Sequence, residues 1–231
     1  MMNSKHFSKI NETLYTAELP NGLRINVVTK PGFELGYAVF ATNYGGAHRR
    51  FFLNGQWHDT PVGVAHYLEH KMFDMPDGDN ALSVLSANGA QPNAFTSSGM
   101  TAYYFSSTSG FEENLRMLLK FVSTPYFIDE TVSKEQGIIG QEIGMVEDSP
   151  GYVIYNRLMR MLYEHNPVRD QVLGLEVNLR LAFLTAFRGN VTMTLQIEDA
   201  SEPLSVLEDA VKSMKGIQSV VLQEAMLKAG E

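Results

Sequence analysis

The strand-like and helix-like patterns of this 231-residue chain come in runs, not in strict alternation along the sequence. Three strand patterns come first, followed by two helical segments, two strands, four helical segments, one strand and a last helix. Runs of like elements are typical of α+β proteins, whereas a doubly wound parallel sheet requires strands and helices to alternate. The sequence therefore predicts an α+β fold in which a single, mostly antiparallel β-sheet packs against several helices.

The strand patterns begin with a hairpin. Residues 14–19 and 23–28 each alternate apolar and polar side chains, and the sequence Pro-Asn-Gly at 20–22 is a strong turn signal. Residues 44–57 contain two glycine-bearing turns and an aromatic patch, and we expect them to leave the sheet. The remaining strands are expected at residues 35–43, 91–97, 101–108 and 191–197.

The helical segments begin at a proline-containing turn. Thr60 is the expected N-cap of a helix that ends near Phe73, with Pro61 in its first turn. A second, short helix at residues 80–88 is expected to end at Gly89. Further helices are expected at residues 111–122, 130–148, 152–163, 171–187 and 202–214.

The charge of the chain excludes one class of partner. Its 18 basic and 26 acidic residues give a formal net charge of -8, so we expect no nucleic-acid partner. No apolar run approaches the roughly 20 residues of a membrane helix, and the first residues show no secretory pattern. We therefore expect a cytoplasmic protein that has no membrane partner. Because no repeat or linker is visible, residues 1–231 are expected to form one domain.

The sequence H-Y-L-E-H at residues 66–70 carries the strongest chemical signal. On a helix, His66 and His70 project from one face one turn apart, close enough to bind a single ion, and Glu69 lies on the same side. The chain has no cysteine, so a metal must be held by His, Asp or Glu. The pattern suits a catalytic zinc with a neighbouring carboxylate as proton acceptor. The alternative is a polar helix surface on which Glu69 pairs with Lys71.

A third metal ligand is expected to be a carboxylate on a rigid element. The helix predicted at 130–148 offers Glu135, Glu142 and Glu147. Glu135 and Glu142 are seven residues apart and share one face of this helix, whereas Glu147 points elsewhere. Isoleucines lie on the shared face as well. At least one of the two carboxylates is therefore expected near the core, where a cation or a donor would satisfy it.

With these residues in place, the sequence resembles the pitrilysin-type zinc metallopeptidases, or inverzincins, which include mitochondrial processing peptidase and insulin-degrading enzyme. The resemblance rests on H-Y-L-E-H followed by Glu142 in the helix at 130–148, and it covers residues 14–197. The sequence is similar above all to small bacterial processing peptidases. The C-terminal part, residues 198–231, is shorter than the corresponding part of the family pattern. Other matching segments are Asn93–Thr96, Tyr103–Phe105, Pro125–Phe127, Glu147-Asp148 with Pro150, and His165 with Pro167.

The resemblance implies a role for each site residue. His66, His70 and Glu142 would be the ligands of one zinc ion, and Glu69 would be the general base. Glu135 would act with Glu69 as a second catalytic acid, supporting the site from outside the ligand set.

The resemblance also implies a strand that binds substrate. Asn93, Ala94, Phe95 and Thr96 would form a strand edge beside the metal, where an extended peptide pairs with the backbone and Phe95 shapes a side-chain pocket. By its own pattern this segment is an ordinary strand.

The activity implied by the resemblance is hydrolysis of peptide bonds in peptides or unfolded segments, with leader-peptide processing as one form of it. The family joins a zinc-bearing half-unit to a second half-unit that carries substrate-orienting Arg and Tyr residues, and this sequence supplies the first. We therefore expect activity only as a dimer, with a homologous subunit lacking the zinc motif as the favoured partner and a homodimer as the alternative. The competing class is a non-catalytic, zinc-stabilised scaffold; Glu69 argues against it, because a structural site needs no base.

Overall fold

The computed structural model describes residues 2–53, 55–174 and 191–197 of the chain. The helix expected at 202–214 lies outside these residues, as does most of the helix expected at 171–187. The described part of that segment, residues 171–174, forms a turn. Gly174 has a φ of 91°, a left-handed conformation that does not continue a helix, and this corrects the predicted start.

The main sheet has seven strands in the order β1-β2-β3-β9-β4-β8-β7. All neighbouring strands are antiparallel except β3 and β9, which are parallel. The predicted α+β class with a mostly antiparallel sheet is therefore confirmed. The strands are β1 (Asn3–Phe7), β2 (Glu12–Glu18), β3 (Arg24–Thr29), β4 (Gly36–Thr42), β7 (Gln91–Thr96), β8 (Thr101–Ser107) and β9 (Val191–Ile197).

Three strands were not predicted. β1 extends the first hairpin at the edge of the main sheet, and all five of its residues are exposed. β5 (Arg50–Leu53) and β6 (Gln56–Asp59) form a separate two-stranded sheet within the tract that was expected to leave the main sheet. β1 is exposed throughout, and β5 and β6 have four residues each, so these strands lack the alternation of apolar and polar residues on which the prediction relied.

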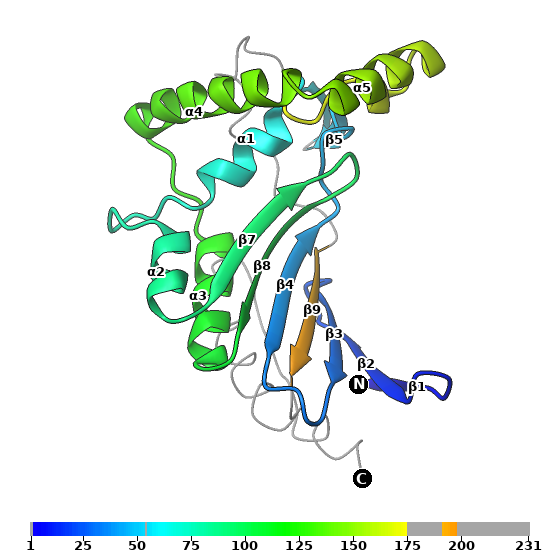
Figure 1. Cartoon of the computed structure of the whole chain (residues 1–231), viewed down its shortest axis with the longest axis vertical. Coiled ribbons are helices and arrows are strands. Elements are labelled where there is room, and N and C mark those ends of the chain that lie inside the picture. Colours follow the sequence, from blue (N-terminus) through cyan, green and yellow to red (C-terminus); the bar gives the residue numbers. More distant parts are fainter. Residues whose placement is uncertain (1, 54, 175–190, 198–231) are drawn as a thin grey trace.

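The helices lie on one face and at one end of the sheet (Figure 1). α2 and α3 pack together and against the strands, while α4 and α5 follow one another across one end of the molecule. α1 lies between α4 and β7. None of the helices in the described ranges has the length and apolar character needed to cross a membrane. Their bounds are α1 (Val64–Lys71), α2 (Ala81–Ala87), α3 (Phe111–Ser123), α4 (Asp129–Glu147), α5 (Pro150–Leu162) and the 3-10 turn η1 (Pro167–Arg169).

The first helix begins later than predicted. Its N-cap is Gly63, so Thr60 and Pro61 belong to the preceding loop. The Thr60 hydroxyl donates to the backbone oxygen of Arg49 at 3.1 Å instead of capping a helix. In contrast, the helix predicted at 80–88 is present as α2, and Asn80 is its N-cap, accepting a hydrogen bond from the backbone N–H of Leu82.

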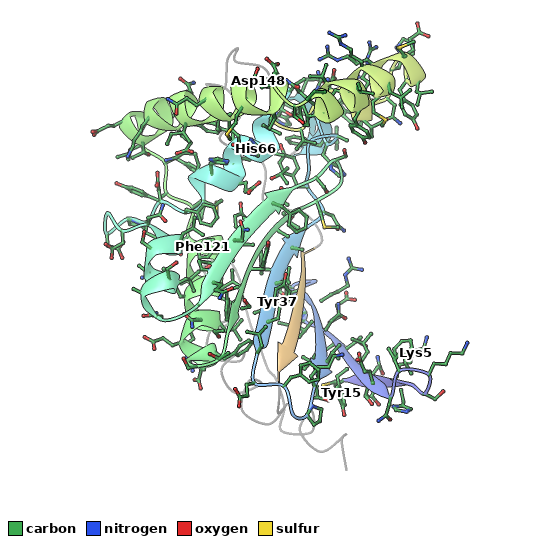
Figure 2. All side chains as sticks on the ribbon, viewed as in Figure 1. Lys5, Tyr15, Tyr37, His66, Phe121 and Asp148 are labelled. Carbon is green, nitrogen blue, oxygen red and sulfur yellow. The ribbon has the colours of Figure 1, made fainter. Side chains whose placement is uncertain are left out.

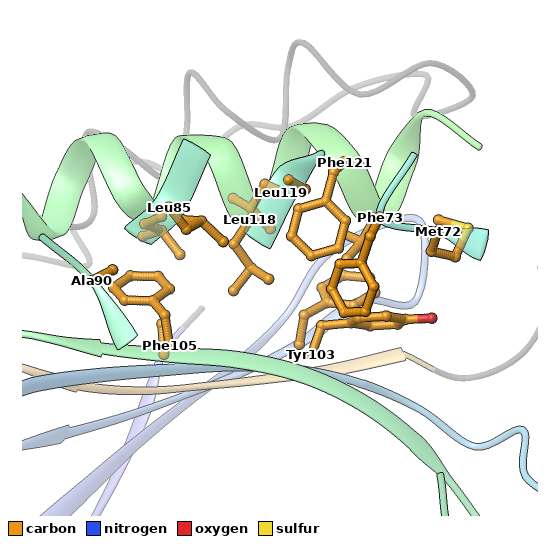
Figure 3. Packing of buried hydrophobic residues seen from close by; sticks show 14 of the residues in the cluster. Met72, Phe73, Leu85, Ala90, Tyr103, Phe105, Leu118, Leu119 and Phe121 are labelled. Atoms are coloured by element: carbon orange, nitrogen blue, oxygen red, sulfur yellow. The ribbon is translucent and has the colours of Figure 1, made fainter. Parts of the chain in front are cut away.

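The main hydrophobic core fills the space between the sheet and the pair α2–α3 (Figure 3). Phe105 of β8 and Leu118 of α3 are completely buried there, and the rings of Tyr103 and Phe121 meet edge to face. Figure 2 places Phe121 in this core and His66 on α1, near α4. A smaller cluster joins α1 to α4; its buried members are Val64, Tyr67, Leu68, Ile139 and Ile143.

Candidate metal centre

The helix that carries H-Y-L-E-H begins at a contact between two glycines. Gly63 has a φ of 92° and Gly174 a φ of 91°. A Cβ atom on either glycine would lie 2.6 Å from the Cα of the other. Any side chain here would be both strained and obstructed, so the two glycines allow the loop before α1 to approach the turn after η1.

α1 is buried along almost its whole length, since seven of its eight residues are buried. The hydroxyl of Tyr67 donates to the backbone oxygen of Val132 in α4 at 2.9 Å. The ammonium of Lys71 donates to the Thr131 hydroxyl at 2.5 Å and pairs with Asp74. Together with the apolar cluster between the helices, these contacts hold α4 against the face of α1 that carries the histidines.

Three possible metal ligands face one another between α1 and α4. The Nε2 atoms of His66 and His70 are 3.3 Å apart, and Oε2 of Glu142 lies 3.6 Å from the first and 3.4 Å from the second. Zinc binds these atom types at about 2.0–2.1 Å, so two ligands at the tetrahedral angle are roughly 3.3–3.4 Å apart. The three atoms therefore fit one face of a zinc tetrahedron. They form the single such group among the described residues.

Burial determines the protonation state of His66. Its side chain is 8% exposed. Burial and the neighbouring His70 lower its pKa to about 4. Its Nε2 faces the other two possible ligands, and its Nδ1 atom is buried with no hydrogen-bond partner among the described residues. At neutral pH the ring is uncharged, which is the form that binds a metal.

Glu135 contacts the outer nitrogen of His70 instead of joining the three ligand atoms. Its Oε1 lies 2.7 Å from Nδ1 of His70. Burial lowers the pKa of His70, but the hydrogen bond and the charge of Glu135 oppose it, and the pKa is raised overall. A carboxylate at Nδ1 holds the ring so that Nε2 faces His66 and Glu142. Glu147, the other candidate acid on α4, is exposed and lies outside the group.

Glu69 is also buried, at 7% exposure. Burial raises the pKa of its carboxyl, a hydrogen bond from Thr96 and the charge of His70 lower it, and Glu142 raises it again, with a net upward shift. The Thr96 hydroxyl donates to Oε2 of Glu69 at 2.5 Å. A carboxylate whose pKa is raised can accept a proton from water and release it again near neutral pH.

The four residues predicted to bind substrate lie on β7, the strand at one edge of the main sheet within the described residues. Exposure alternates along this strand. Asn93 is exposed and Phe95 is 44% exposed, whereas Ala94 and Thr96 are partly buried. The segment therefore presents two faces, and the Thr96 side chain points to Glu69 on α1.

Sequence reasoning missed this contact of Thr96. Glu69 and Thr96 are 27 positions apart and lie on different elements, so no local pattern connects them. It also missed the hydrogen bonds of Tyr67 and Lys71 to α4, because their partners follow from helix packing.

Comparisons with known proteins agree with this arrangement. The family model described as Insulinase (Peptidase family M16) matches residues 52–175, more than half of the chain. The uncharacterized zinc protease YmfH of Bacillus subtilis is 45% identical over 75% of this chain and 41% of its own length. A probable mitochondrial-processing peptidase subunit beta of Arabidopsis thaliana is 26% identical over 78% of this chain and 33% of its own length.

A solved structure has the same fold. The M16-like peptidase from Alicyclobacillus acidocaldarius superposes with a TM-score of 0.81 and 35% identity, covering 92% of this chain and 50% of that chain. The chain thus spans half or less of the length of these three relatives. It corresponds to roughly one half-unit of the fold.

Proposed function

This chain belongs to the insulinase family of peptidases, family M16, and from this premise we propose that it is the zinc-bearing part of a metalloendopeptidase. In this proposal it hydrolyses peptide bonds in extended peptides or unfolded segments. The processing of leader peptides is one form of this activity. The cytoplasmic location expected from the sequence is part of the same proposal.

One observation carries the proposal: a buried carboxyl lies beside three atoms that match a zinc site in size. His66, His70 and Glu142 would hold the ion, since their ligand atoms are 3.3–3.6 Å apart. Glu69 is next to His70 in the chain, and its charge is coupled to those of His70 and Glu142. A purely structural zinc site needs ligands but no such carboxyl, which disfavours the scaffold alternative.

The mechanism assigns each proton to a named group. When bound, zinc supplies a Lewis acid that polarises the scissile carbonyl and lowers the pKa of a water. Glu69 accepts the proton of that water and later passes it to the leaving amine. The raised pKa of Glu69 suits both steps, because a strongly acidic carboxyl would not hold the proton between them. Glu135 orients His70 by its hydrogen bond to Nδ1.

The substrate is proposed to lie along β7. The strand is at the edge of the described sheet and next to α1, so an extended peptide can pair with its outer backbone. The N–H of Ala94 donates to Oδ1 of Asn93 at 2.8 Å, and it would exchange this bond for one to the peptide. The side chains of Asn93 and Phe95 are exposed and would contact the peptide. Because an edge strand recognises extended backbone, folded proteins are expected to be poor substrates.

A second half-unit is proposed to complete the site. Support comes from the relatives, which are two to three times as long as the part that this chain matches, and from one relative that is named a subunit. Its role would be to supply donors for the oxyanion that forms at the scissile carbonyl. The favoured source is a homologous subunit that lacks the zinc motif, and a second copy of this chain is the alternative.

The test is a peptidase assay on the zinc-loaded protein, alone and mixed with the homologous subunit, using an unstructured fluorogenic peptide. Glu69→Gln should retain one zinc and lower kcat by about 10²–10⁴-fold, because the proton acceptor is lost. Glu147→Gln changes an exposed acid on α4 and should leave kcat unchanged.

The outcomes separate the two classes of function. Activity of the mixture that disappears in Glu69→Gln supports the proposal, including the second half-unit. A zinc-loaded wild type that binds its partner but cleaves no peptide would establish the scaffold instead. Normal turnover by the Gln variant would exclude Glu69 as the base.

A further inference from the structure

We infer that Thr96 is a positioning residue for Glu69, holding the carboxylate so that one of its oxygens is free to act as the base. The inference rests on the proposed function, since it concerns how that base is oriented. It also changes the role predicted for Thr96, whose side chain was grouped with the residues that contact substrate.

The first step is the direction of the Thr96 side chain. Side chains of β7 alternate between an exposed face and a partly buried one, and Thr96 lies on the buried face with Ala94. Its Oγ1 is 2.5 Å from Oε2 of Glu69. The hydroxyl is therefore directed to α1, away from the face on which Phe95 is exposed.

The second step follows the hydroxyl protons. Thr96 lies opposite Thr101 of β8, and their Oγ1 atoms are 3.4 Å apart. The hydroxyl of Thr101 donates to the backbone oxygen of Tyr44 at 2.8 Å, so its single proton is already used. Because a carboxylate is the strongest acceptor nearby, the proton of Thr96 goes to Glu69.

The third step concerns the two oxygens of Glu69. Oε2 accepts the bond from Thr96, and within the described chain Glu69 has no second hydrogen-bond partner for its side chain. One hydrogen bond to one oxygen restricts rotation of the carboxylate and leaves the other oxygen available for a proton. Groups that orient an active-site residue in this way typically contribute about 10- to 100-fold to activity.

The contact also links two parts of the proposed site. Thr96 is the last residue of β7, and Glu69 lies on α1, next to His70 in the chain. The strand proposed to bind the peptide is thus tied directly to the residue proposed to act on it. A shift of this end of β7 would turn the base away from its working position.

The experiment compares three variants of the zinc-loaded protein, assayed with the partner that activity requires. Thr96→Val keeps the shape but removes the hydroxyl, and should lower kcat about 10- to 100-fold with KM and zinc content unchanged. Thr96→Ser keeps the hydroxyl and should restore most of kcat. The matched control is Thr42→Val, a buried threonine of β4 that should keep full activity.

Three results would overturn the inference. Full activity of Thr96→Val would show that the hydrogen bond is not needed. A raised KM with normal kcat would make Thr96 a substrate contact. Loss of zinc would place its effect on the metal centre.

A second measurement does not depend on peptidase activity. In crystals of the zinc-loaded wild type, Glu69 should adopt one rotamer bound to Thr96, and in Thr96→Val it should occupy more than one. An unchanged Glu69 in the variant would refute the positioning role. If the wild type proves inactive while Glu69 moves in the variant, the proposed function fails but the positioning contact stands.

Discussion

α3 and α1 both pack against the main sheet, yet they bury very different side chains. α3 buries six residues, of which Asn114 is the only polar one, and its outer face is charged. α1 buries seven of its eight residues, and these include His66, Glu69 and Lys71. Apolar burial is sufficient to explain the position of α3, since each large buried side chain contributes about 1.5–3 kcal/mol.

Apolar burial alone does not explain the position of α1. Burial of ionisable groups opposes folding unless each group finds a partner. Here Lys71 pairs with Asp74 and Thr131, and Glu69 accepts from Thr96. The comparison separates a helix held by apolar burial from one whose buried ionisable groups lower stability unless each is paired.

The largest expected effect concerns the main core, in which α3 packs against the sheet. Phe105→Ala removes a fully buried ring of the main core and should lower the free energy of unfolding by about 3–5 kcal/mol. Because the ring does not belong to the cluster around α1, zinc affinity of the folded protein should change little. Denaturant unfolding and a zinc competition titration measure the two quantities.

The corresponding substitution near α1 is Leu68→Ala. Leu68 belongs to the small cluster between α1 and α4, and its loss should weaken zinc binding about 10- to 100-fold by loosening the ligands. Phe127 packs against both clusters, so the regions are in contact. If Phe105→Ala weakened zinc binding as much as Leu68→Ala does, the proposed separation of the two regions would be wrong.

The next effect is that of zinc itself, which in the proposal binds between α1 and α4 and so stabilises the folded protein. At a free zinc concentration of 100 times Kd, the free energy of unfolding should rise by about 2.7 kcal/mol, and a chelator should reverse this. His70→Ala removes one of the three facing ligands and should abolish the increase. His165→Ala, which changes an 88% exposed histidine, is the control and should keep it. Equal stabilisation of His70→Ala and wild type would place the zinc elsewhere.

The sequence predicted the α3 side well because its elements follow from local periodicity. The stripe of leucines in α3 and the hairpin of β2 and β3 each depend on residues close in sequence. The position of β9 between β3 and β4 does not, because its parallel pairing with β3 joins segments far apart in the chain. The family resemblance read from H-Y-L-E-H is confirmed by the family match.

Without the family resemblance, residue spacing predicts the site between α1 and α4 only as a set of residue types. Helical spacing brought His66 and His70 together, and the seven-residue spacing put Glu135 and Glu142 on one face. The spacing could not show which acid faces both histidines, because that depends on how α4 crosses α1. The predicted N-cap at Thr60 failed for a similar reason: α1 starts where Gly63 meets Gly174, a long-range contact.

The smallest expected effect is a gain of stability in the variant Glu69→Gln, which changes a buried residue of α1. Burial raises the pKa of Glu69 above its ordinary value of 4.5, so the folded protein favours the protonated, neutral carboxyl. The stability contributed by this group is therefore fully present below pH 4.5 and is lost as the pH rises through the higher pKa of the folded state. Glu69→Gln is neutral at every pH and escapes that loss. Above the folded-state pKa, the metal-free variant should unfold with a free energy about 0.5–2 kcal/mol higher than wild type.

The pH profile distinguishes this reason from a general effect of removing a charge. The advantage of Glu69→Gln should vanish at low pH and grow as the pH rises, in urea unfolding of the metal-free proteins. Glu34→Gln, which removes an exposed carboxylate from a loop, should show no such trend. If Glu69→Gln were less stable than wild type at neutral pH, burial of Glu69 would not oppose folding. α1 would then owe its position to its polar contacts as much as α3 does to its apolar ones, and the contrast between the two helices would disappear.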